Sequence, residues 1–570
     1  MGGVARAVRV SRDLAREELA RALAARRFLA QTGMLEDLAL AGVLALLRGR
    51  GRLTPSMTVR FHAANSPHRA ALIEPRTGRH LSYAELDRAV DRTVELLRTL
   101  GIDKGDAVLL MLRNTVEFLL LQLAIGRVGG AAVTVSFRST ASELGYLMRH
   151  SRARALFFAS DRGDAVRQAL STPGDAIGGR AVQVGGHGGG FTTFDELFDA
   201  ASSGAPARVL EFDEAGTGEA SFVIYTSGTT GRPKGAVRKF DRRSMLAVLG
   251  FLVEVPLRVG QRHLAVCPLY HATAFAFVGF SFLLGNTVVL ADFEAEDFLD
   301  LLERYRIHHA AVVPTQLYRV LELGRDVVRA RDTSSLVALF CGGAPLSGAL
   351  ASRVMEAFGD KLFNFYGATE TGLVTLAKPH DLRVAPGTIG RTLLGNEVRL
   401  LDREGREVAN GEVGELHVKS GNLVVGYHDD GAATEASTRD GYFSVGDLAR
   451  QDERGYLFLE GRARDMIVSG GVNVYPREVE DVIAAFRGVG DVAVVGLPDE
   501  EWGERVHAFV EPQHGASLDL AALDAHCRAE LAGPKRPRGV TVVESLPRNP
   551  TGKTLKTELR ELARTAVERA

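Results

Sequence analysis

Residues 225–236 constrain the fold of this chain more than any other stretch, because they place a polar, glycine-rich loop directly after a short apolar run. They read Tyr-Thr-Ser-Gly-Thr-Thr-Gly-Arg-Pro-Lys-Gly-Ala. The run at 221–225 is typical of a buried strand. Glycine lets the backbone approach a ligand closely, and successive N–H groups in such a loop form a concavity that binds anions. The pattern favours a phosphate-binding loop at the end of a strand, with a mobile polar turn as the alternative.

The loop does not match the Walker A pattern, which needs a glycine, four residues and then Gly-Lys followed by Ser or Thr. Here Lys234 follows Pro233 and precedes Gly235. The only near match is Gly-Lys-Thr at 552–554, where Pro547 stands in place of the first glycine. Both departures argue against a P-loop kinase or ATPase.

Length, charge and cysteine content narrow the class of protein further. The chain has 570 residues, which is too many for one hydrophobic core. It has 69 basic and 70 acidic residues, which argues against a nucleic-acid partner bound through phosphate neutralisation. Cys267, Cys341 and Cys527 are far apart and form no CxxC pair. They predict a reducing compartment, no disulfide and no zinc site, with each thiol buried as a small apolar group.

The first fifty residues have a composition of their own, with nine arginines, no lysine and five acids. The apolar run at 38–47 is ten residues long, whereas a membrane-spanning helix needs about 20. We expect helices near 12–30 and 35–47. The segment either docks on the main domain or lies on a membrane as an amphipathic anchor. The expected location is cytoplasmic, with peripheral membrane contact as the alternative.

The rest of the chain predicts an α/β fold with two domains. A strand at Ala107–Met111, a helix at 116–126 capped by Asn114 and a strand at 131–135 indicate a parallel sheet covered by helices. The uncharged stretch 264–291 is interpreted as core that also lines a pocket. Short strands after Arg391 indicate a β-subdomain. The predicted boundaries are a helical extension at 1–50, a large domain at 51–463 and a small α+β domain at 464–570.

Six further motifs follow the loop in order, and with it they resemble the adenylate-forming (ANL) superfamily over roughly residues 55 to 560. This superfamily contains acyl-CoA synthetases, aryl-CoA ligases, adenylation domains of peptide synthetases and luciferases. The motifs are Cys-Gly-Gly-Ala-Pro at 341–345, Asn-Phe-Tyr-Gly-Ala-Thr-Glu-Thr-Gly at 364–372, Tyr-Phe-Ser-Val-Gly-Asp at 442–447, Gly-Arg-Ala-Arg-Asp-Met-Ile at 461–467, Gly-Gly-Val-Asn-Val-Tyr-Pro at 470–476 and Pro-Arg-Asn-Pro-Thr-Gly-Lys at 547–553. One motif alone would be weak, but seven in order are specific.

The resemblance implies a fold and a two-step reaction. The fold is a large N-terminal domain of parallel sheets with a β-subdomain, followed by a small mobile C-terminal domain. A carboxylate attacks the α-phosphate of ATP, and a thiol, here that of CoA, then takes the acyl group and releases AMP. The loop would hold the β- and γ-phosphates through Thr226, Ser227, Gly228, Thr229, Thr230, Gly231 and Lys234. The resemblance also implies catalytic roles for Lys553, Thr226, Glu370 and His271.

The remaining nucleotide contacts are also implied by the resemblance. Glu370 would bind Mg²⁺ together with Thr226, since Mg²⁺ sites usually combine one or two carboxylates with substrate phosphates. Asp447 would bind both ribose hydroxyls, with Arg462 as a second ribose contact. Val445 stands where the family usually has threonine, so a hydroxyl that supports the backbone is expected to be lost. The other nucleotide-binding residues implied are Gly343, Ala344, Pro345, Tyr366 against the adenine face, Gly367, and Thr369 near the α-phosphate.

The resemblance places the moving parts at the C-terminal end. Lys553 would contact the carboxylate and the α-phosphate during adenylation. Arg464 matches the hinge about which the small domain rotates, so that Gly470 and Gly471 approach the pantetheine channel. His271 would gate the acyl site. Taken alone, a C-terminal lysine is usually solvent-facing, and such a histidine is more often a core or capping residue.

These expectations amount to an AMP-forming acyl-CoA synthetase acting on a medium- to long-chain fatty acid. The segment near His271 is rich in Phe, Val, Leu and Ala and has no lysine or arginine for a second carboxylate. An aryl-acid–CoA ligase and a ligase that loads the pantetheine of a carrier protein are alternatives. A non-enzymatic nucleotide-binding protein is disfavoured by the retention of Lys234, Glu370, Asp447 and Lys553. The sequence leaves the oligomeric state open.

Overall fold

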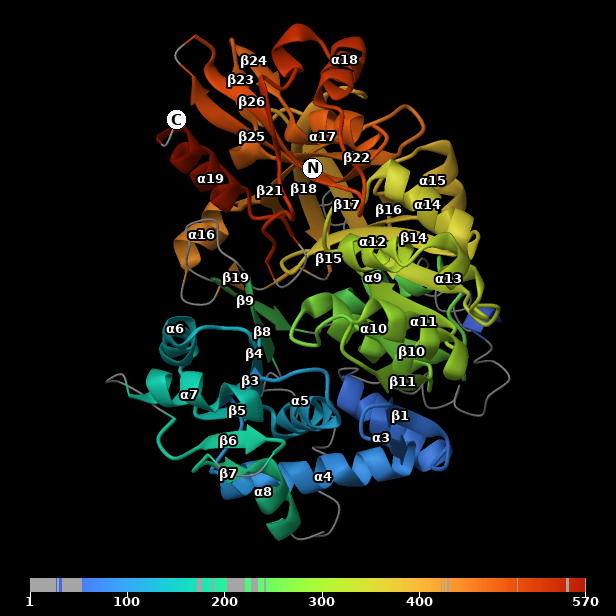
Figure 1. Cartoon of the computed structure of the whole chain (residues 1–570). Helices are drawn as coiled ribbons and strands as arrows, with labels where there is room; N and C mark the ends of the chain where they lie inside the picture. Colours follow the sequence, from blue (N-terminus) through green and yellow to red (C-terminus); the bar gives the residue numbers. More distant parts are fainter. Residues whose placement is uncertain are drawn as a thin grey trace, which may run out of the picture.

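The computed structural model shows an α/β protein whose two large sheets are mainly parallel, as the sequence predicts (Figure 1). It describes residue 27 and residues 30–32, 54–171, 177–186, 189–201, 221–226, 234–239, 242–421, 423–424, 426–427, 430–499, 501–549 and 553–568. The predicted helical extension at 1–50 lies almost wholly outside these residues. So does the central part of the phosphate loop, 227–233.

The first large sheet forms the middle of the molecule and, within the described residues, has nine strands. Six neighbouring strands are parallel, and antiparallel strands close both edges. In spatial order they are β16 (Arg391–Thr392), β15 (Gly372–Ala377), β14 (Leu362–Ala368), β13 (Ala338–Cys341), β12 (His309–Val312), β10 (Arg262–Ala265), β11 (Thr287–Leu290), β1 (Ala70–Glu74) and β2 (Arg79–Ser82). The helices of this region are α9 (Arg242–Leu252), α10 (Ala272–Leu283), α11 (Ala295–Arg304), α12 (Pro314–Glu322), α13 (Arg325–Arg329), α14 (Gly348–Phe358) and α15 (Pro379–Val384).

The second large sheet has eight strands in the described part of the chain and includes the two strands that flank the predicted phosphate-binding loop. Its order is β19 (Gly426–Tyr427), β9 (Lys234–Lys239), β8 (Ser221–Thr226), β4 (Ala131–Thr134), β3 (Ala107–Met111), β5 (Ala155–Ala159), β6 (Ala181–Val184) and β7 (Thr192–Thr193). The helices of this region are α3 (Pro55–Asn65), α4 (Tyr83–Thr99), α5 (Val116–Val128), α6 (Ala141–Ser151), α7 (Gly163–Leu170) and α8 (Phe194–Ala200). In Figure 1 the edge of this sheet formed by β5, β6 and β7 lies at the end of the molecule opposite the small C-terminal domain.

Two smaller sheets follow, and each has five strands among the described residues. The antiparallel β-subdomain contains β17 (Asn396–Leu401), β18 (Val413–Ser420), β20 (Thr438–Arg439), β21 (Tyr442–Gln451) and β22 (Leu457–Arg462), beside α16 (Gly431–Ala436). The small domain contains β23 (Ile467–Ser469), β24 (Val472–Val474), β25 (Val489–Asp499), β26 (Gly503–Pro512) and β27 (Gly539–Val542), with α17 (Pro476–Ala484), α18 (Leu520–Glu530) and α19 (Lys556–Glu568). Its strands are antiparallel except for β27, which runs parallel to β26.

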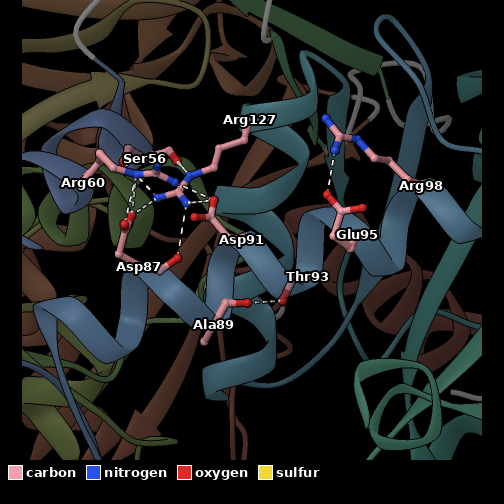
Figure 2. A network of polar contacts seen from close by, with 9 residues as sticks. All are labelled: Ser56, Arg60, Asp87, Ala89, Asp91, Thr93, Glu95, Arg98 and Arg127. Carbon is pink, nitrogen blue, oxygen red and sulfur yellow. Dashed lines mark hydrogen bonds and ion pairs between the residues drawn. The ribbon is translucent and has the colours of Figure 1, made fainter. Parts of the chain in front are cut away.

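A charged network ties α3, α4 and α5 together, as Figure 2 shows. Arg127 of α5 donates to Ser56 at 2.7 Å and pairs with Asp91 at 2.5 Å and with Asp87. Arg60 of α3 pairs with the same two carboxylates, at 3.0 and 2.5 Å. Each carboxylate therefore faces two guanidinium groups, which offsets the cost of withdrawing the charges from water. We interpret the network as structural, because it joins three helices of the large domain.

The structure corrects one local prediction and confirms others. The N-cap of α5 is Thr115, whose hydroxyl accepts from Phe118 N–H, and not Asn114. The amide of Asn114 instead donates to carbonyls of three distant residues, Ala265, Cys267 and Ala291. The strand at Ala107–Met111 and the buried, unpaired cysteines are confirmed. None of the described helices has the length and apolar character needed to cross a membrane.

Four residues of the N-terminal extension are described, and three of them contact the large domain near 254–259. Gln31 donates to the Val255 carbonyl at 2.9 Å, and Val259 N–H donates to the Thr32 carbonyl at 3.0 Å. Arg27 lies 4.0 Å from Glu254. These contacts join the described part of the extension to the large domain.

Candidate active site

A buried carboxylate on the β-subdomain organises the site. Asp447 on β21 lies directly opposite Arg462 on β22, and Arg462 Nε is 3.1 Å from Asp447 Oδ1. Tyr366, near the end of β14, donates its hydroxyl to Asp447 Oδ2 at 2.7 Å. Asp447 and Tyr366 are each 8% exposed. Three segments separated by up to 96 positions therefore meet at one carboxylate, and both of its oxygens are held.

The protonation state of Tyr366 follows from this setting. Burial, and then the neighbouring Asp447 carboxylate, raise the pKa of Tyr366 well above its ordinary value. Glu370 adds a smaller contribution in the same direction, so its carboxylate is near the same group. Tyr366 is accordingly a neutral hydrogen-bond donor throughout the physiological range.

The turn that presents Asp447 keeps a supporting hydroxyl, which corrects the expectation drawn from Val445. Gly446 has φ +77°, a conformation that favours glycine. Its N–H donates to the Ser444 hydroxyl at 3.0 Å, and that hydroxyl donates to Glu415 at 2.5 Å. The support that the family usually takes from threonine comes here from the residue before Val445.

Lys553 reaches this group from the small domain. Its backbone N–H donates to the Asn549 side chain at 2.8 Å, and Asn549 N–H donates to the Lys553 carbonyl at 2.9 Å. Burial, followed by the positive charge of Arg462, lowers the pKa of Lys553 to about 8. Asp447 acts in the opposite direction, which places the ammonium group near the carboxylate that holds Tyr366 and Arg462. The structure thus brings together Tyr366, Asp447, Arg462 and Lys553.

Glycines in two motifs are explained by close packing. A Cβ on Gly367 would lie 1.9 Å from the Gly372 carbonyl oxygen, where β14 approaches β15. A Cβ on Gly342 would lie 2.4 Å from the Phe365 ring, and Gly343 has φ +79°. Ala344 is half-buried and Pro345 is exposed, in the connection between β13 and α14. These contacts bring the 341–345 and 364–372 motifs against each other.

The predicted phosphate-binding loop lies between β8 and β9 in the sequence, and these strands pair antiparallel with Thr226 opposite Lys234. The strand predicted at 221–225 is confirmed as β8. The structure describes the backbone of Thr226 and Lys234 but not their side chains, and Ser227, Gly228, Thr229, Thr230 and Gly231 lie outside the described residues. Tyr225 is held by a hydrogen bond between its hydroxyl and His150 Nδ1, at 2.8 Å.

Glu370 and Thr369 lie in the turn between β14 and β15, and Glu370 is 8% exposed. No group of three or more His, Cys, Asp or Glu side chains is placed to hold a metal ion, as far as the structure describes the chain. A single buried carboxylate close to Tyr366 is compatible with Mg²⁺, because Mg²⁺ takes most of its ligands from phosphates and water.

His271 occupies the N-cap position of α10. Burial lowers its pKa to about 4, so the ring is neutral at physiological pH. Its Nε2 atom is buried and has no hydrogen-bond partner among the described residues, and its ring lies 4.2 Å from that of Tyr270. Phe277 and Val278 of the same helix are fully buried in two different core clusters. They belong to the core, as the interpretation of 264–291 as core allows, and no exposed surface of theirs is left to line a pocket.

Gly470 and Gly471 form the turn of the hairpin that joins β23 and β24. Their φ values of +58° and +79° fit a type I′ turn, which favours glycine at both central positions. Both are exposed, and Trp502 packs where a Cβ on Gly470 would lie. Arg464 is exposed in the short 3-10 helix Ala463–Asp465 between β22 and β23, and its charge contributes to the lowered pKa of Lys553.

Sequence reasoning missed two supporting residues of the site, Ser444 and Asn549. Both lie inside recognised motifs, so the sequence shows that Ser444 is near Asp447 and that Asn549 is near Lys553. Their hydrogen bonds depend on turn geometry that the motif letters alone do not specify. A polar residue within four positions of a functional residue, in a segment expected to turn, would have been the usable signal.

Comparisons with known proteins found similar sequences and similar structures. The sequence pattern of the family described as "AMP-binding enzyme" matches residues 59–428, and that of the "AMP-binding enzyme C-terminal domain" matches residues 478–553. A long-chain-fatty-acid–CoA ligase, FadD13 of Mycobacterium tuberculosis, is 33% identical over 88% of this chain and 97% of that protein. A feruloyl-CoA synthase of an Amycolatopsis species is 36% identical over 87% of this chain and 96% of that protein. ATP-bound MatB from Rhodopseudomonas palustris has a TM-score of 0.77 and 29% identity, over 90% of this chain and 99% of that one.

Proposed function

Because the chain belongs to the AMP-binding enzyme family and is an AMP-forming acid–thiol ligase, we propose that it activates a medium- to long-chain fatty acid and transfers it to CoA. ATP and CoA are the co-substrates of this class of reaction. The observation that carries the proposal is that Lys553 lies close enough to Arg462 and Asp447 for both charges to shift its pKa, beside the contacts that Asp447 makes with Tyr366 and Arg462. It places a cation of the small domain beside a carboxylate of the large domain.

The reaction has two half-steps whose charges explain this arrangement. In the first, a carboxylate oxygen attacks the α-phosphorus of ATP, the bond to the bridging oxygen breaks, and pyrophosphate leaves with that electron pair. Two anions must approach each other, so a positioned ammonium group stabilises the transition state. In the second, the CoA sulfur attacks the acyl carbonyl carbon, AMP leaves, and the thiol proton passes to solvent. We assign the ammonium to Lys553, which is needed in the first step only.

We assign the nucleotide to the groups around Asp447. An ionised carboxylate offers about four lone-pair positions, of which Tyr366 and Arg462 use two, so two remain for the ribose hydroxyls. The adenine would lie against Tyr366. The phosphates would lie in the 226–234 loop, with His271 near the acyl group. The other proposed contacts are Gly343, Ala344, Pro345, Gly367 and Thr369.

We further propose that Mg²⁺ is held by Glu370, with Thr226 and the substrate phosphates completing its ligands. The ion would supply positive charge to the phosphate oxygens during the first half-step. The part of this chain that supports the assignment is the burial of Glu370 next to Tyr366.

The small domain is proposed to act as a mobile lid over residues 464–570, with the large domain at 51–463 and the hinge at Arg464. Hinges need few residues, and the three-residue 3-10 helix between β22 and β23 is a short connection of this kind. After rotation, Lys553 would leave the site. The exposed hairpin turn of Gly470 and Gly471 would then approach the pantetheine arm of CoA.

The proposed acid is an alkyl chain because α10, which His271 precedes, has no charged residue along its length. His271 itself is neutral, so this helix offers no cation to a second carboxylate. An aromatic acid is the second candidate. It is favoured by the 36% identity with a feruloyl-CoA synthase, which exceeds the 33% identity with the fatty-acid ligase.

The test is the rate of pyrophosphate release across acids from acetate to palmitate, with benzoate, cinnamate and ferulate included, and with and without CoA. Each buried CH₂ contributes about 0.8 kcal/mol, so kcat/KM should rise roughly fourfold per methylene until the pocket is full. A maximum at an aromatic acid would replace the fatty acid by the second candidate. If the enzyme completes only one turnover with CoA but continues to turn over with the pantetheine of a carrier protein, the carrier protein would replace CoA as the proposed acceptor of the acyl group.

A further inference from the structure

Helix α12 of the large domain lies against the small domain at a place that no motif marks. The hydroxyl oxygen of Tyr318 sits so close to Gly490, at the start of β25, that a Cβ there would be 2.3 Å from it. Four residues later on the same helix, Glu322 accepts a hydrogen bond from His514 N–H at 3.4 Å. Glu322 and Tyr318 are both half-buried. The small domain thus meets one face of α12 at two successive turns.

The two α12 side chains are fixed from within the large domain. Arg353 of α14 pairs with Glu322 at 3.1 Å, and its guanidinium lies 5.8 Å from the centre of the Tyr318 ring. Burial, and then the carboxylates of Glu322 and Glu511, raise the pKa of Tyr318 to about 12. Tyr318 is therefore neutral, and its ring and hydroxyl present a fixed surface to the small domain.

The strands that α12 touches also hold the segment that leads to Lys553. Asp491, next to Gly490, pairs with Arg548. Glu511 on β26 accepts a hydrogen bond from Leu546 N–H at 3.0 Å. Asn549, which follows Arg548, accepts from Lys553 N–H through its side chain at 2.8 Å. A short chain of contacts therefore connects α12 with the lysine.

Charge on α12 acts on Glu511 and Arg548, two residues of this chain of contacts. Burial is the main cause that raises the pKa of Glu511, and Arg319 opposes that rise. Arg319 also contributes to lowering the pKa of Arg548, after burial. Arg319 is thus close to both residues that support the lysine segment, attracting one and repelling the other. The carboxylate of Glu322 repels that of Glu511, whose pKa it raises, so the hydrogen bond from His514 N–H forms against this repulsion. The packing of Tyr318 on Gly490 is the contact that involves no charge.

We propose that the face of α12 formed by Tyr318 and Glu322 is the seat on which the small domain rests during adenylation. Both are positioning residues: they touch no substrate and act by holding the strands that carry Lys553. The absence of a side chain at Gly490 lets β25 approach this seat. This inference rests on the proposed function, because it assigns the present arrangement of the domains to the first half-reaction.

The test compares the two half-reactions in full-length Tyr318→Ala and Glu322→Gln variants. Adenylation is followed by pyrophosphate release in single turnover, and thioester formation by the reaction of supplied acyl-adenylate with CoA. The loss of one such contact should slow adenylation roughly fivefold to tenfold. Thioester formation should stay unchanged or become faster, because the domain leaves its first arrangement more easily. Glu356→Gln is the matched control, since Glu356 is an exposed glutamate on α14 that pairs with Arg325 outside this contact.

A second pair of variants distinguishes the proposed role of α12 from a simple loss of folding. Gly490→Ala places a methyl group against the Tyr318 hydroxyl and should slow adenylation selectively. Adding Tyr318→Phe removes that hydroxyl and should restore part of the rate; the restoration is partial because the Pro512 carbonyl is also 2.9 Å from the added carbon. Equal loss of both half-reactions, or no loss in either, would overturn the role of α12. If Lys553→Ala also failed to separate the half-reactions, the fault would lie in the proposed function instead.

Discussion

Two parts of the candidate site are built in different ways: the proposed ribose end, around Asp447, and the lysine end, at Lys553. Tyr366, Asp447 and Arg462 all belong to the large domain, where strand pairing places Asp447 opposite Arg462. Lys553 belongs to the small domain and reaches the same group across the boundary between the domains. The first end is fixed within the large domain, by strands of two sheets, whereas the second depends on where the small domain sits. A change at the ribose end should therefore affect both half-reactions, and a change at the lysine end only one.

The sharpest test of this comparison is Lys553→Ala. Removing one charged group that stabilises a transition state costs on the order of 10²–10³ in rate, and we expect that loss in adenylation. Thioester formation from supplied acyl-adenylate should change less than twofold. Lys419→Ala, an exposed lysine of the β-subdomain, is the control. Parallel losses in the two half-reactions would mean that the lysine is structural and that the two ends do not differ.

Asp447→Ala tests the other end. A hydrogen bond to a charged group contributes about 1.5–3 kcal/mol, so KM for ATP should rise by roughly one to two orders of magnitude. KM for the acid should hardly move. The thioester step should also weaken, because the acyl-adenylate carries the same ribose. If ATP dependence stayed normal, Asp447 would be only a turn residue, and the ribose end would have to be sought elsewhere.

The two ends also differ in how far the sequence could predict them. Asp447 and Arg462 could be named from motifs that resemble those of the family, but the pairing that sets them opposite each other was not predicted. The support from Ser444 was not predicted, because it depends on the turn at Gly446. The Asn114 cap was wrong for the same kind of reason: Thr115 is one residue closer, and Asn114 bonds to carbonyls more than 150 positions away.

The surroundings of Lys553 are harder to predict from the sequence. The motif identifies Lys553, but burial and the charge of Arg462 set its pKa, and both arise only when the domains meet. The contact of α12 with Gly490 has no motif at all. Phe277 and Val278 show the same limit inside one helix, since an apolar run does not say which residues face a pocket and which face a core.

The pH dependence of the two half-reactions tests the same comparison, with a smaller expected effect than the two substitutions above. The pKa of Lys553 is lowered from 10.5 to about 8, so the group is an ammonium below pH 8 and loses its charge as pH rises above it. Adenylation should fall to half near pH 8 and roughly tenfold by pH 9, while thioester formation should not show this decline. Pre-steady-state rates from pH 6.5 to 9.5 measure both steps. An adenylation rate flat across this range would mean that Lys553 keeps its charge in the complex.

The same pKa shift makes a prediction about stability. In the unfolded chain the lysine stays protonated to about pH 10.4, whereas in the folded chain it loses its proton near 8. The unfolded state therefore binds more protons between these values, and the free energy of unfolding gains a positive contribution as pH rises through that window. Comparing urea unfolding of the wild type and Lys553→Met at pH 7.5 and 9.5 isolates this contribution. A pH dependence that is identical in the two proteins would contradict the burial of the ammonium.

The smallest effect we expect comes from Tyr366→Phe, which keeps the ring and removes only the hydroxyl that holds Asp447 Oδ2. The carboxylate would then lose one of its two fixed contacts, and KM for ATP should rise roughly fivefold, the cost of an ordinary hydrogen bond. If the hydroxyl acts by orienting Asp447 toward the ribose, the penalty should shrink with 2′,3′-dideoxy-ATP, which has no ribose hydroxyls to recognise. Coupling between a hydroxyl on the protein and hydroxyls on the substrate is the signature that a general loss of stability would not produce. An equal penalty with both nucleotides would mean that Tyr366 acts on the adenine alone, and that the ribose end needs only Arg462 to orient its carboxylate.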